Sequence, residues 1–234
     1  MIIAIDGTVA SGKSTAAKSL AQRLGYTYIN TGLMYRAVAA YARRHEIPTS
    51  DFAHVAQCAQ ELRIDLRTQD DGQHVFVNGE DYTADATAPD IGVDVSNVAD
   101  NEAVRAVLVR EQRRLGLAAG NAVLEGRDIG SVVFPDAGIK FFVTADSRER
   151  AHRRLDDDRK KNPAITLAQV EAAVVARDTR DRERPVGPLL RMPGAIDIDT
   201  TRNSPAATLD QMLRHVAAVQ QRAAGRDAHT GSGS

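Results

Sequence analysis

Eight residues near the start of the chain have the types and spacing of a phosphate-binding loop, or P-loop. They follow the pattern G-x-x-x-x-G-K-[ST] and are Gly7, Thr8, Val9, Ala10, Ser11, Gly12, Lys13 and Ser14. Glycines let such a loop turn tightly and bring backbone N–H groups close to phosphates. The lysine of this pattern reaches the β- and γ-phosphates, and the final hydroxyl ligates Mg²⁺. The motif predicts that these residues, with Thr15, bind a nucleoside triphosphate, that Lys13 is catalytic and that Ser14 holds the metal.

The flanks of the loop have the context that this motif requires. Residues 2–5 are consecutive apolar residues, typical of a strand that is buried on both faces. After the loop, apolar residues recur at helical spacing, and a helix N-terminus adds N–H donors and a partial positive charge. The alternative is a chance glycine-rich turn before a helix. The filled motif positions and the two flanks favour nucleotide binding.

Two groups of arginines have the spacing to stabilise the charge of a phosphoryl group in transfer. They are Arg150 and Arg154 in the first group, and Arg177, Arg180 and Arg184 with Asp181 in the second. The spacing of each group places most of its members on one helix face. A solvated, salt-bridged hairpin is the alternative, and it is the interpretation we favour for the charged segment 156–163 between the groups. For the arginines themselves we favour a mobile lid that carries them inward and excludes water.

Apolar runs separated by helical patterns predict an α/β fold with a parallel, doubly wound sheet. The expected strands lie at residues 2–5, 26–29, 122–124, 139–143 and 196–198. Ligands of such sheets bind at the carboxyl ends of the strands. The P-loop and residues 30–32 and 125–128 all follow strands, so we expect them to surround one crevice.

A small antiparallel segment interrupts this alternation. Residues 62–67 alternate with period two, residues 74–77 form a second short apolar run, and Asn78-Gly79 is a strong hairpin signal. We expect an insertion of about three strands within residues 62–95, with residues 82–95 mostly irregular.

After the insertion, Asp100 is expected to cap a helix over residues 102–115, with Gly116 ending it.

Composition excludes several classes of protein. The chain has 234 residues, a hydrophobic share of 43% and a net charge of −1, so no global basic surface suggests nucleic acid or an anionic membrane. Its single cysteine excludes an internal disulfide, and no apolar run reaches membrane-spanning length. The first residues lack the basic region of a signal peptide, so we expect a cytoplasmic protein. The guanine motif N-K-x-D of GTPase switches is missing from the sequence, which favours a small-molecule kinase.

Three further motifs resemble those of bacterial cytidylate kinases, which are nucleoside monophosphate kinases with a P-loop. Residues 31–36, T-G-L-M-Y-R, are similar to the family's [ST]-G-x-x-Y-R. Residues 125–135, E-G-R-D-I-G-S-V-V-F-P, resemble its most specific segment, G-R-D-[IM]-G-T-V-V-F-P. Residues 177–184 resemble its R-D-x-x-D-x-x-R helix. The resemblance covers nearly all of residues 1–220, and the small β insertion is a further mark of the bacterial members.

The resemblance implies Mg²⁺-dependent, in-line transfer of a phosphoryl group from ATP to CMP or dCMP. The implied ligands of the CMP phosphate are Thr31, Tyr35, Arg36, Arg127 and Arg184; those of cytosine are Ser96, Arg105 and Asp128; those of the ribose are Arg177 and Asp181. Arg150 and Arg154 would contact the adenine and the phosphates of ATP. Arg127, Arg154 and Arg180 would join Lys13 in stabilising the transferred group.

The resemblance also implies a division into three units. A P-loop core comprises residues 1–30, 117–150 and 185–224; a CMP-binding lobe comprises residues 31–116; a lid and its following helix comprise residues 151–184. Residues 225–234 are expected to be an irregular tail. A monomer is the family's usual form.

Two positions depart from the family pattern, and two other functions stay open. Thr8 stands where the family usually has proline, and Asn30 stands where it often has aspartate. The second change removes a negative charge near the metal and the CMP phosphate. One alternative function is a kinase for another small acceptor, such as UMP or shikimate. The other is a nucleotide-dependent switch that hydrolyses ATP slowly.

Overall fold

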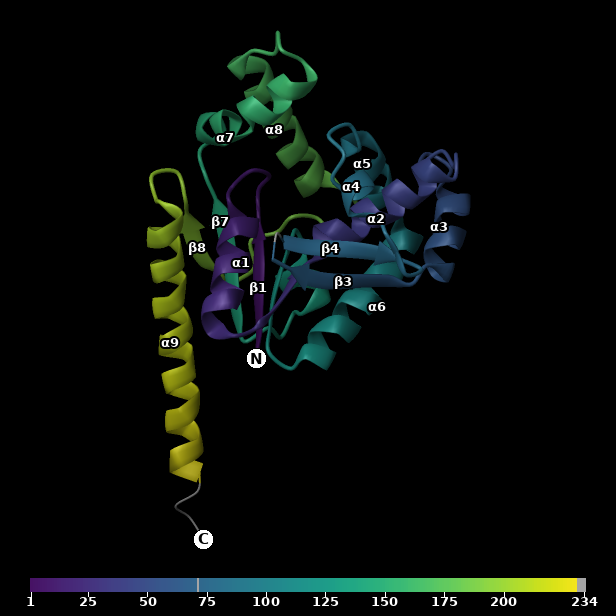
Figure 1. The fold of residues 1–234 in the computed structure, drawn as a ribbon. Helices are drawn as coiled ribbons and strands as arrows, with labels where there is room; N and C mark the ends of the chain where they lie inside the picture. The colour runs from purple at the N-terminus through teal and green to yellow at the C-terminus, as the bar shows by residue number, and fades with distance from the viewer. Residues whose placement is uncertain (71, 231–234) are drawn as a thin grey trace.

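A five-stranded parallel sheet forms the centre of the structure, a computed structural model that describes residues 1–70 and 72–230 (Figure 1). Its strand order is β2-β6-β1-β7-β8, and the strands are β1 (Ile2–Gly7), β2 (Thr27–Asn30), β6 (Ala122–Gly126), β7 (Ile139–Thr144) and β8 (Ile196–Asp199). The P-loop follows the central strand, and Asp6 pairs in register with Gly126. The predicted fold class is confirmed, and the loop lies beside the segment that follows β6.

Helices cover both faces of this sheet. Helix α1 (Lys13–Leu24) ends at Gly25 in the left-handed conformation, and it packs with α9 (Pro205–Thr230) on one face. Apolar residues of β1, β7 and α9, among them Ile5, Phe141 and Met212, fill the space between these layers. On the other face, α6 (Glu102–Ala119) covers a second cluster that includes Leu124. The central strands are thus buried on both faces, as their continuous apolar runs predicted.

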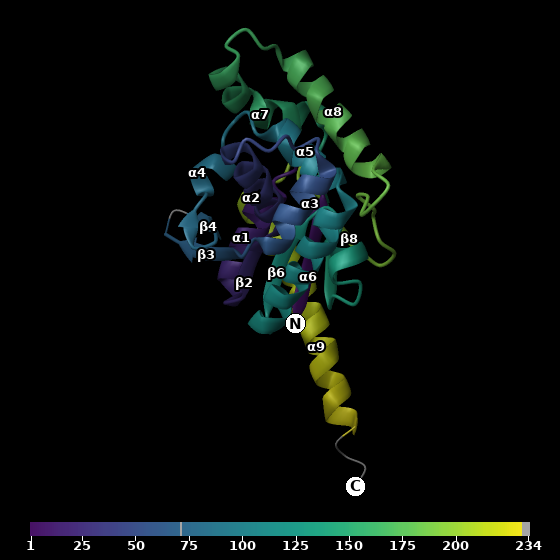
Figure 2. The same cartoon turned by 90° about the vertical axis from the view of Figure 1, so that its right-hand side faces the viewer.

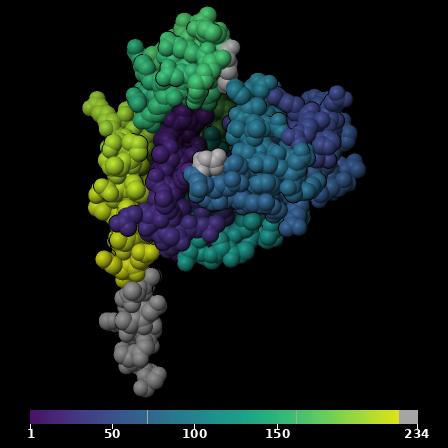
Figure 3. Space-filling model, in the orientation of Figure 1, coloured from purple at the N-terminus to yellow at the C-terminus, as the bar shows by residue number. Residues whose placement is uncertain are grey.

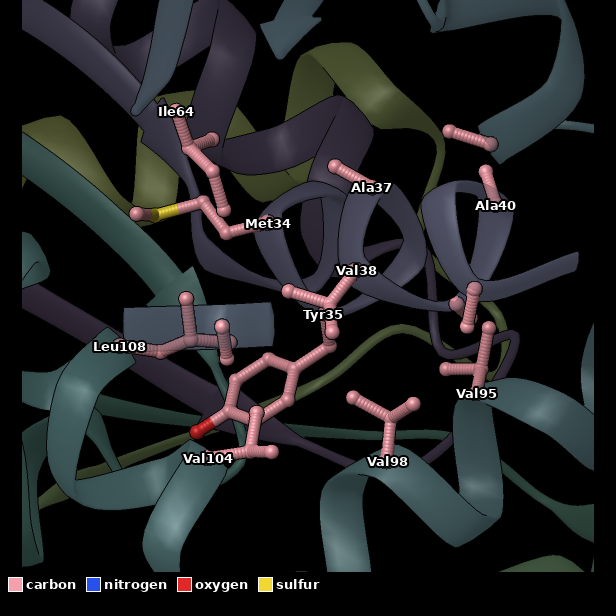
Figure 4. Packing of buried hydrophobic residues seen from close by; sticks show 14 of the residues in the cluster. Met34, Tyr35, Ala37, Val38, Ala40, Ile64, Val95, Val98, Val104 and Leu108 are labelled. Carbon is pink, nitrogen blue, oxygen red and sulfur yellow. The ribbon is translucent and has the colours of Figure 1, made fainter. Parts of the chain in front are cut away.

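A lobe of short helices lies to one side of the sheet. It contains α2 (Thr31–Arg44), α3 (Phe52–Glu61), α4 (Thr83–Ala86), α5 (Gly92–Asp100) and the start of α6. The predicted insertion is present as an antiparallel sheet of β3 (Ile64–Gln69), β4 (Gly72–Val77) and β5 (Glu80–Asp81). The ring of Tyr35 lies among Val98, Val104 and Leu108, where α2 meets α5 and α6 (Figure 4).

Two predictions for this lobe are wrong. Residues 82–95 are not mostly irregular, because α4 and the first turn of α5 lie there. Helix α6 is capped by Asn101 rather than Asp100, and it continues through Gly116 to Ala119. Gly116 serves packing instead of ending the helix: a Cβ there would lie 2.6 Å from the Phe134 ring. A glycine that allows close approach and a glycine that ends a helix are indistinguishable in sequence.

The two helices of the predicted lid form a hairpin above the carboxyl ends of the strands (Figure 1). They are α7 (Ser147–Lys161), capped by Asp146, and α8 (Leu167–Glu183), which begins with a complete capping box of Thr166 and Gln169. An opening separates this hairpin, the N-terminal segment and the lobe (Figure 3).

The last helix is longer than expected. Helix α9 continues to Thr230 and extends away from the sheet (Figure 2), so residues 225–230 are helical rather than irregular. The rest of the predicted tail, residues 231–234, lies outside the described residues. Over the part of the chain that the structure covers, no helix is both long and apolar enough to cross a membrane.

Candidate functional site

A pocket of about 240 Å³ opens at the carboxyl ends of β1, β2 and β6. It adjoins a wider cleft of about 930 Å³ beneath the lid hairpin. Most of the predicted site residues line one of the two cavities. From the P-loop these are Val9, Ala10, Lys13 and Ser14; from the arginine-bearing motifs and their neighbours they are Thr31, Tyr35, Arg36, Arg105, Arg127, Asp128, Arg154, Arg177 and Arg184. Segments far apart in the sequence thus meet in one crevice, as the strand positions predicted.

The P-loop has the close contacts that its glycines allow. A Cβ on Gly7 would lie 2.0 Å from the Val143 carbonyl oxygen, so only glycine fits there. The Lys13 ammonium lies 3.5 Å from the Thr8 carbonyl oxygen and 3.9 Å from Glu125 Oε2. Burial, assisted by the charge of Arg127, lowers the pKa of Lys13 to about 8. A buried cation whose ion pair with Glu125 is as long as 3.9 Å is suited to an anionic ligand.

Glu125 is the carboxylate beside the predicted metal ligand. It is 3% exposed, and its Oε1 accepts hydrogen bonds from Ser14 Oγ at 2.7 Å and from the Tyr28 hydroxyl at 3.2 Å. A hydroxyl and a carboxylate are hard oxygen ligands, so this pair fits Mg²⁺. Sequence reasoning included Glu125 in a motif and gave it no role. Its place at the end of the strand next to the P-loop strand was the available signal.

Four arginines converge on the space between the two cavities. Burial lowers the pKa of Arg36, and the neighbouring charges of Arg177, Arg154 and Arg127 lower it further. Among the described residues, the Arg36 side chain donates only to a backbone carbonyl, that of Ala86, at 3.2 Å. Like charges held this close favour a bound anion, because an anion relieves their repulsion.

Carboxylates hold two of these arginines in place. Asp181 accepts from Arg127 Nε at 2.8 Å and from Arg177 Nε at 3.2 Å, and it is 2% exposed. Burial alone would raise the pKa of Asp181, but the charges of Arg127 and Arg177 outweigh it and hold the pKa below its usual value. Arg177 also donates to the Ser96 hydroxyl, which brings Ser96 to the site.

A buried ion pair lies in the part of the pocket lined by the lobe. Arg105 donates to Asp128 Oδ2, and the two residues are 2% and 4% exposed. The Nε of Arg105 has no hydrogen-bond partner among the described residues. The backbone of Gly187 packs against this pair, since a Cβ on Gly187 would lie 2.0 Å from an Arg105 nitrogen. The Gly187 carbonyl accepts a hydrogen bond from Arg184. Nothing in the sequence around Gly187 indicated this contact.

The base of the lid is attached to the P-loop through Val9. Asp178 Oδ1 accepts from the Val9 N–H at 3.1 Å, and Arg150 donates to the Val9 carbonyl at 3.0 Å. Arg150 and Asp178 also pair with each other at 2.5 Å, and both are buried. Arg150 therefore binds the backbone of the P-loop in this structure. Sequence reasoning had assigned it to the nucleotide. Asp178 belongs to the R-D-x-x-D-x-x-R motif, but sequence reasoning gave it no role.

Two predicted lid arginines are paired with nearby carboxylates. Arg180 donates twice to Asp100 and is not among the residues that line the two cavities, so the structure does not bring it to the site. Arg154 lines the wider cleft and donates to Asp158 on its own helix.

A third cavity, of about 350 Å³, lies on the other side of the P-loop. It is lined by Gly12, Thr15, Ala16, Glu149, Arg153, Thr200, Asn203, Pro205 and Thr208. Arg153 donates to the Thr200 carbonyl oxygen at 2.7 Å, and it was missed in the sequence, where Arg150 and Arg154 had the more regular spacing. Ser11, a predicted residue of the P-loop, does not line this cavity. It is fully buried, and its hydroxyl donates to the Thr8 carbonyl at 2.9 Å.

Asp6 connects the P-loop strand to the segment that carries Arg127 and Asp128. Its carboxylate accepts from the N–H groups of Ile129 and Gly130 at 2.8 and 2.7 Å. These residues begin a π-helical turn, Ile129–Val133. Burial raises the pKa of Asp6 to about 6. The position of Arg127 and Asp128 thus depends on the strand that precedes the phosphate loop.

Comparisons with known proteins agree with this geometry. The sequence profile described as "Cytidylate kinase" matches residues 3–218. A protein of Thermotoga maritima named "Cytidylate kinase" is 44% identical over 215 residues, which are 92% of this chain and 96% of that protein. One of the same name from Symbiobacterium thermophilum is 42% identical over 216 residues, with coverages of 92% and 95%. The crystal structure of an uncharacterized protein from Eubacterium ventriosum matches with a TM-score of 0.50 at 12% identity. The match covers 93% of this chain and 98% of that one, and it supports the fold alone.

Proposed function

Because the chain belongs to the cytidylate kinase family, we propose that it transfers the γ-phosphoryl group of ATP to CMP and dCMP and so forms CDP and dCDP. The observation that carries the choice of acceptor is the buried Arg105–Asp128 pair in the pocket. Cytosine has an amino donor beside two acceptors, N3 and O2. A carboxylate accepts from the first, and an arginine donates to the others.

The donor is placed by the P-loop. The loop N–H groups and Lys13 would hold its phosphates, and Ser14 with Glu125 would hold the Mg²⁺, which neutralises charge on the β- and γ-phosphates when bound. The cavity beside Arg153 is the place we assign to the adenine base, since a guanidinium stacks well on a planar ring.

The acceptor is placed by the lobe and by α8. We assign its phosphate to Thr31, Tyr35, Arg36, Arg127 and Arg184, its ribose to Arg177 and Asp181, and its base to Ser96, Arg105 and Asp128. The convergence of Arg36, Arg127 and Arg177 beside the P-loop supports this assignment, because it brings the acceptor phosphate next to Lys13. Burial raises the pKa of Tyr35 to about 12, so its hydroxyl stays protonated and can donate to an anion.

The chemistry needs no covalent intermediate. An oxygen of the CMP phosphate attacks the γ-phosphorus in line, and the bond from that phosphorus to the β,γ-bridging oxygen breaks. Lys13, Arg127 and Arg154 would stabilise the charge on the transferred group. For Arg154 and Arg180 to reach that group, each would exchange its present carboxylate, Asp158 or Asp100, for phosphate.

The test is coupled ADP release with Mg²⁺-ATP and each of CMP, dCMP, UMP, AMP and GMP. We expect strong turnover with CMP and dCMP and a kcat/KM for UMP at least about tenfold lower, because uracil places a carbonyl where cytosine has the amine that Asp128 accepts. Preferred turnover of UMP or AMP would contradict the roles of Ser96, Arg105 and Asp128. Tight ATP binding with no acceptor-dependent ADP release would favour a nucleotide-dependent switch.

A further inference from the structure

Strand β2 forms one edge of the central sheet, and a side chain of the β insertion covers that edge. Within the described part of the chain, β2 has a single strand neighbour, β6. An edge strand presents backbone N–H and C=O groups that need partners. Gln73 of β4 supplies both: its Nε2 donates to the Tyr28 carbonyl at 2.6 Å, and its Oε1 accepts from the Asn30 N–H at 2.8 Å.

A primary amide is suited to this task. It carries a donor and an acceptor side by side, as a peptide unit of a neighbouring strand would. Gln73 alternates with Val75 and Val77 along β4, so the three share a face. The two valines are buried in the cluster beneath α2, which also contains Met34 and Val38. One face of the insertion therefore holds both β2 and the helix that follows it.

The backbone that Gln73 holds leads directly into the proposed phosphate site. The Asn30 side chain caps α2 by accepting from the Leu33 N–H at 3.1 Å. The next residue, Thr31, donates through its hydroxyl to the Glu125 carbonyl at 2.8 Å. Tyr35 and Arg36 follow about one turn further along α2. A shift of Asn30 would move the cap and the first turn together.

We propose that Gln73 is a positioning residue for the acceptor, and that this is a function of the β insertion. By holding the backbone of β2, Gln73 fixes the position at which α2 begins. It thereby fixes where Thr31, Tyr35 and Arg36 lie relative to the P-loop. The assignment of the acceptor rests on the proposed function. The P-loop follows β1, which β6 separates from β2 in the sheet, so we expect a larger effect on the acceptor than on ATP.

The first variant is Gln73→Leu, which removes both hydrogen bonds at similar volume. We expect KM for CMP to rise about tenfold and KM for ATP to change less than twofold, since each lost bond weakens an equilibrium by about two- to tenfold. Gln73→Glu keeps an oxygen for the Asn30 N–H and loses the donor to Tyr28, so its KM for CMP should be intermediate. Gln69→Leu, an outward-facing glutamine of β3 in the same sheet, is the matched control and should leave both KM values unchanged.

A second readout does not depend on activity. Hydrogen exchange of the Asn30 amide, measured by NMR on the whole protein, should be about tenfold faster in Gln73→Leu than in the wild type or in Gln69→Leu. Unchanged exchange at Asn30 would overturn the proposal.

Steady-state kinetics give two further outcomes that would overturn it. One is a wild-type KM for CMP in Gln73→Leu; the other is a parallel rise of both KM values, which is the signature of a general loss of stability. Lack of CMP turnover by the wild-type protein would overturn the proposed function as well, whereas normal CMP turnover in Gln73→Leu would overturn only this inference.

Discussion

The arginines of the acceptor pocket and those of the lid differ in how they are held. In the pocket, Arg105 and Arg127 each pair with a carboxylate that is at most 4% exposed. On the lid side, Arg180 pairs with Asp100 while its own side chain is 46% exposed. Removing one partner of a buried ion pair strongly destabilises the folded protein, because the other charge stays buried without compensation. An exposed ion pair contributes little to the stability of the fold. The pocket is therefore built before the acceptor arrives, whereas Arg180 is held weakly enough to be released to a ligand.

Removing one partner of the pocket pair should have the largest effect on stability. Asp128→Ala leaves the Arg105 charge buried without its carboxylate, and we expect the free energy of unfolding to fall by about 3–5 kcal/mol. Urea denaturation measures it. Asp100→Ala removes a carboxylate from the lid-side pair and is the control, with an expected loss below about 1 kcal/mol. Equal losses in the two variants would contradict the difference between the regions.

The next largest effect concerns Lys13, the buried cation of the P-loop. Lys13→Ala should lower kcat by about 10²–10³-fold, or roughly 3–4 kcal/mol of transition-state stabilisation, because it removes a preorganised donor to the transferred group. Single-turnover kinetics with a folded variant measure it. Lys18→Ala, on the solvent side of α1, should be close to wild type. A near-normal rate in Lys13→Ala would exclude its catalytic role.

The pH dependence sharpens the distinction between buried and exposed cations. Because the pKa of Lys13 in the free protein is lowered to about 8, its charge is lost as the pH rises above 8, and kcat/KM for ATP should then fall up to about tenfold per pH unit. In the unfolded chain the same lysine titrates near its ordinary 10.5, so between about pH 8 and 10.5 the unfolded state binds more protons. Stability relative to Lys13→Met should therefore rise with pH over this interval. A flat kcat/KM profile to pH 9.5 would contradict the lowered pKa.

The smallest effect belongs to the lid-side pair itself. A double-mutant cycle of Arg180→Ala and Asp100→Ala should give a coupling free energy below about 1 kcal/mol in thermal or urea unfolding, and 0.5 M salt should reduce it. A coupling above 2 kcal/mol would mean that this pair locks the lid to the lobe, and the two regions would then be equally rigid.

The sequence predicted the parallel sheet and its loops well because each signal was local. The P-loop pattern, the apolar strands and the Asn78-Gly79 hairpin need only neighbouring residues to be recognised. Positions following different strands could be expected to meet because parallel strands share a carboxyl edge.

The contacts that sequence reasoning missed join residues that are distant in the chain. Gln73 binds β2 from 43 and 45 residues away, and Asp178 binds Val9 from 169 residues away. Helical spacing showed that Arg150 and Arg154 lie near each other on α7, but it could not show that Arg150 turns beneath the P-loop. Directions of side chains depend on the packing of whole elements, which no local pattern contains.

The double attachment of Val9 limits where the lid can pivot. Asp178 of α8 accepts from the Val9 N–H and Arg150 of α7 donates to the Val9 carbonyl, so both helices are hydrogen-bonded to one residue of the P-loop. A hairpin that rotates over the cleft must therefore bend after Arg150 and before Asp178. The rotating arm would then be residues 151–177, and the turn between the two helices would travel furthest. The pivot of such a rotation would lie at the phosphate cradle itself, because Val9 belongs to both.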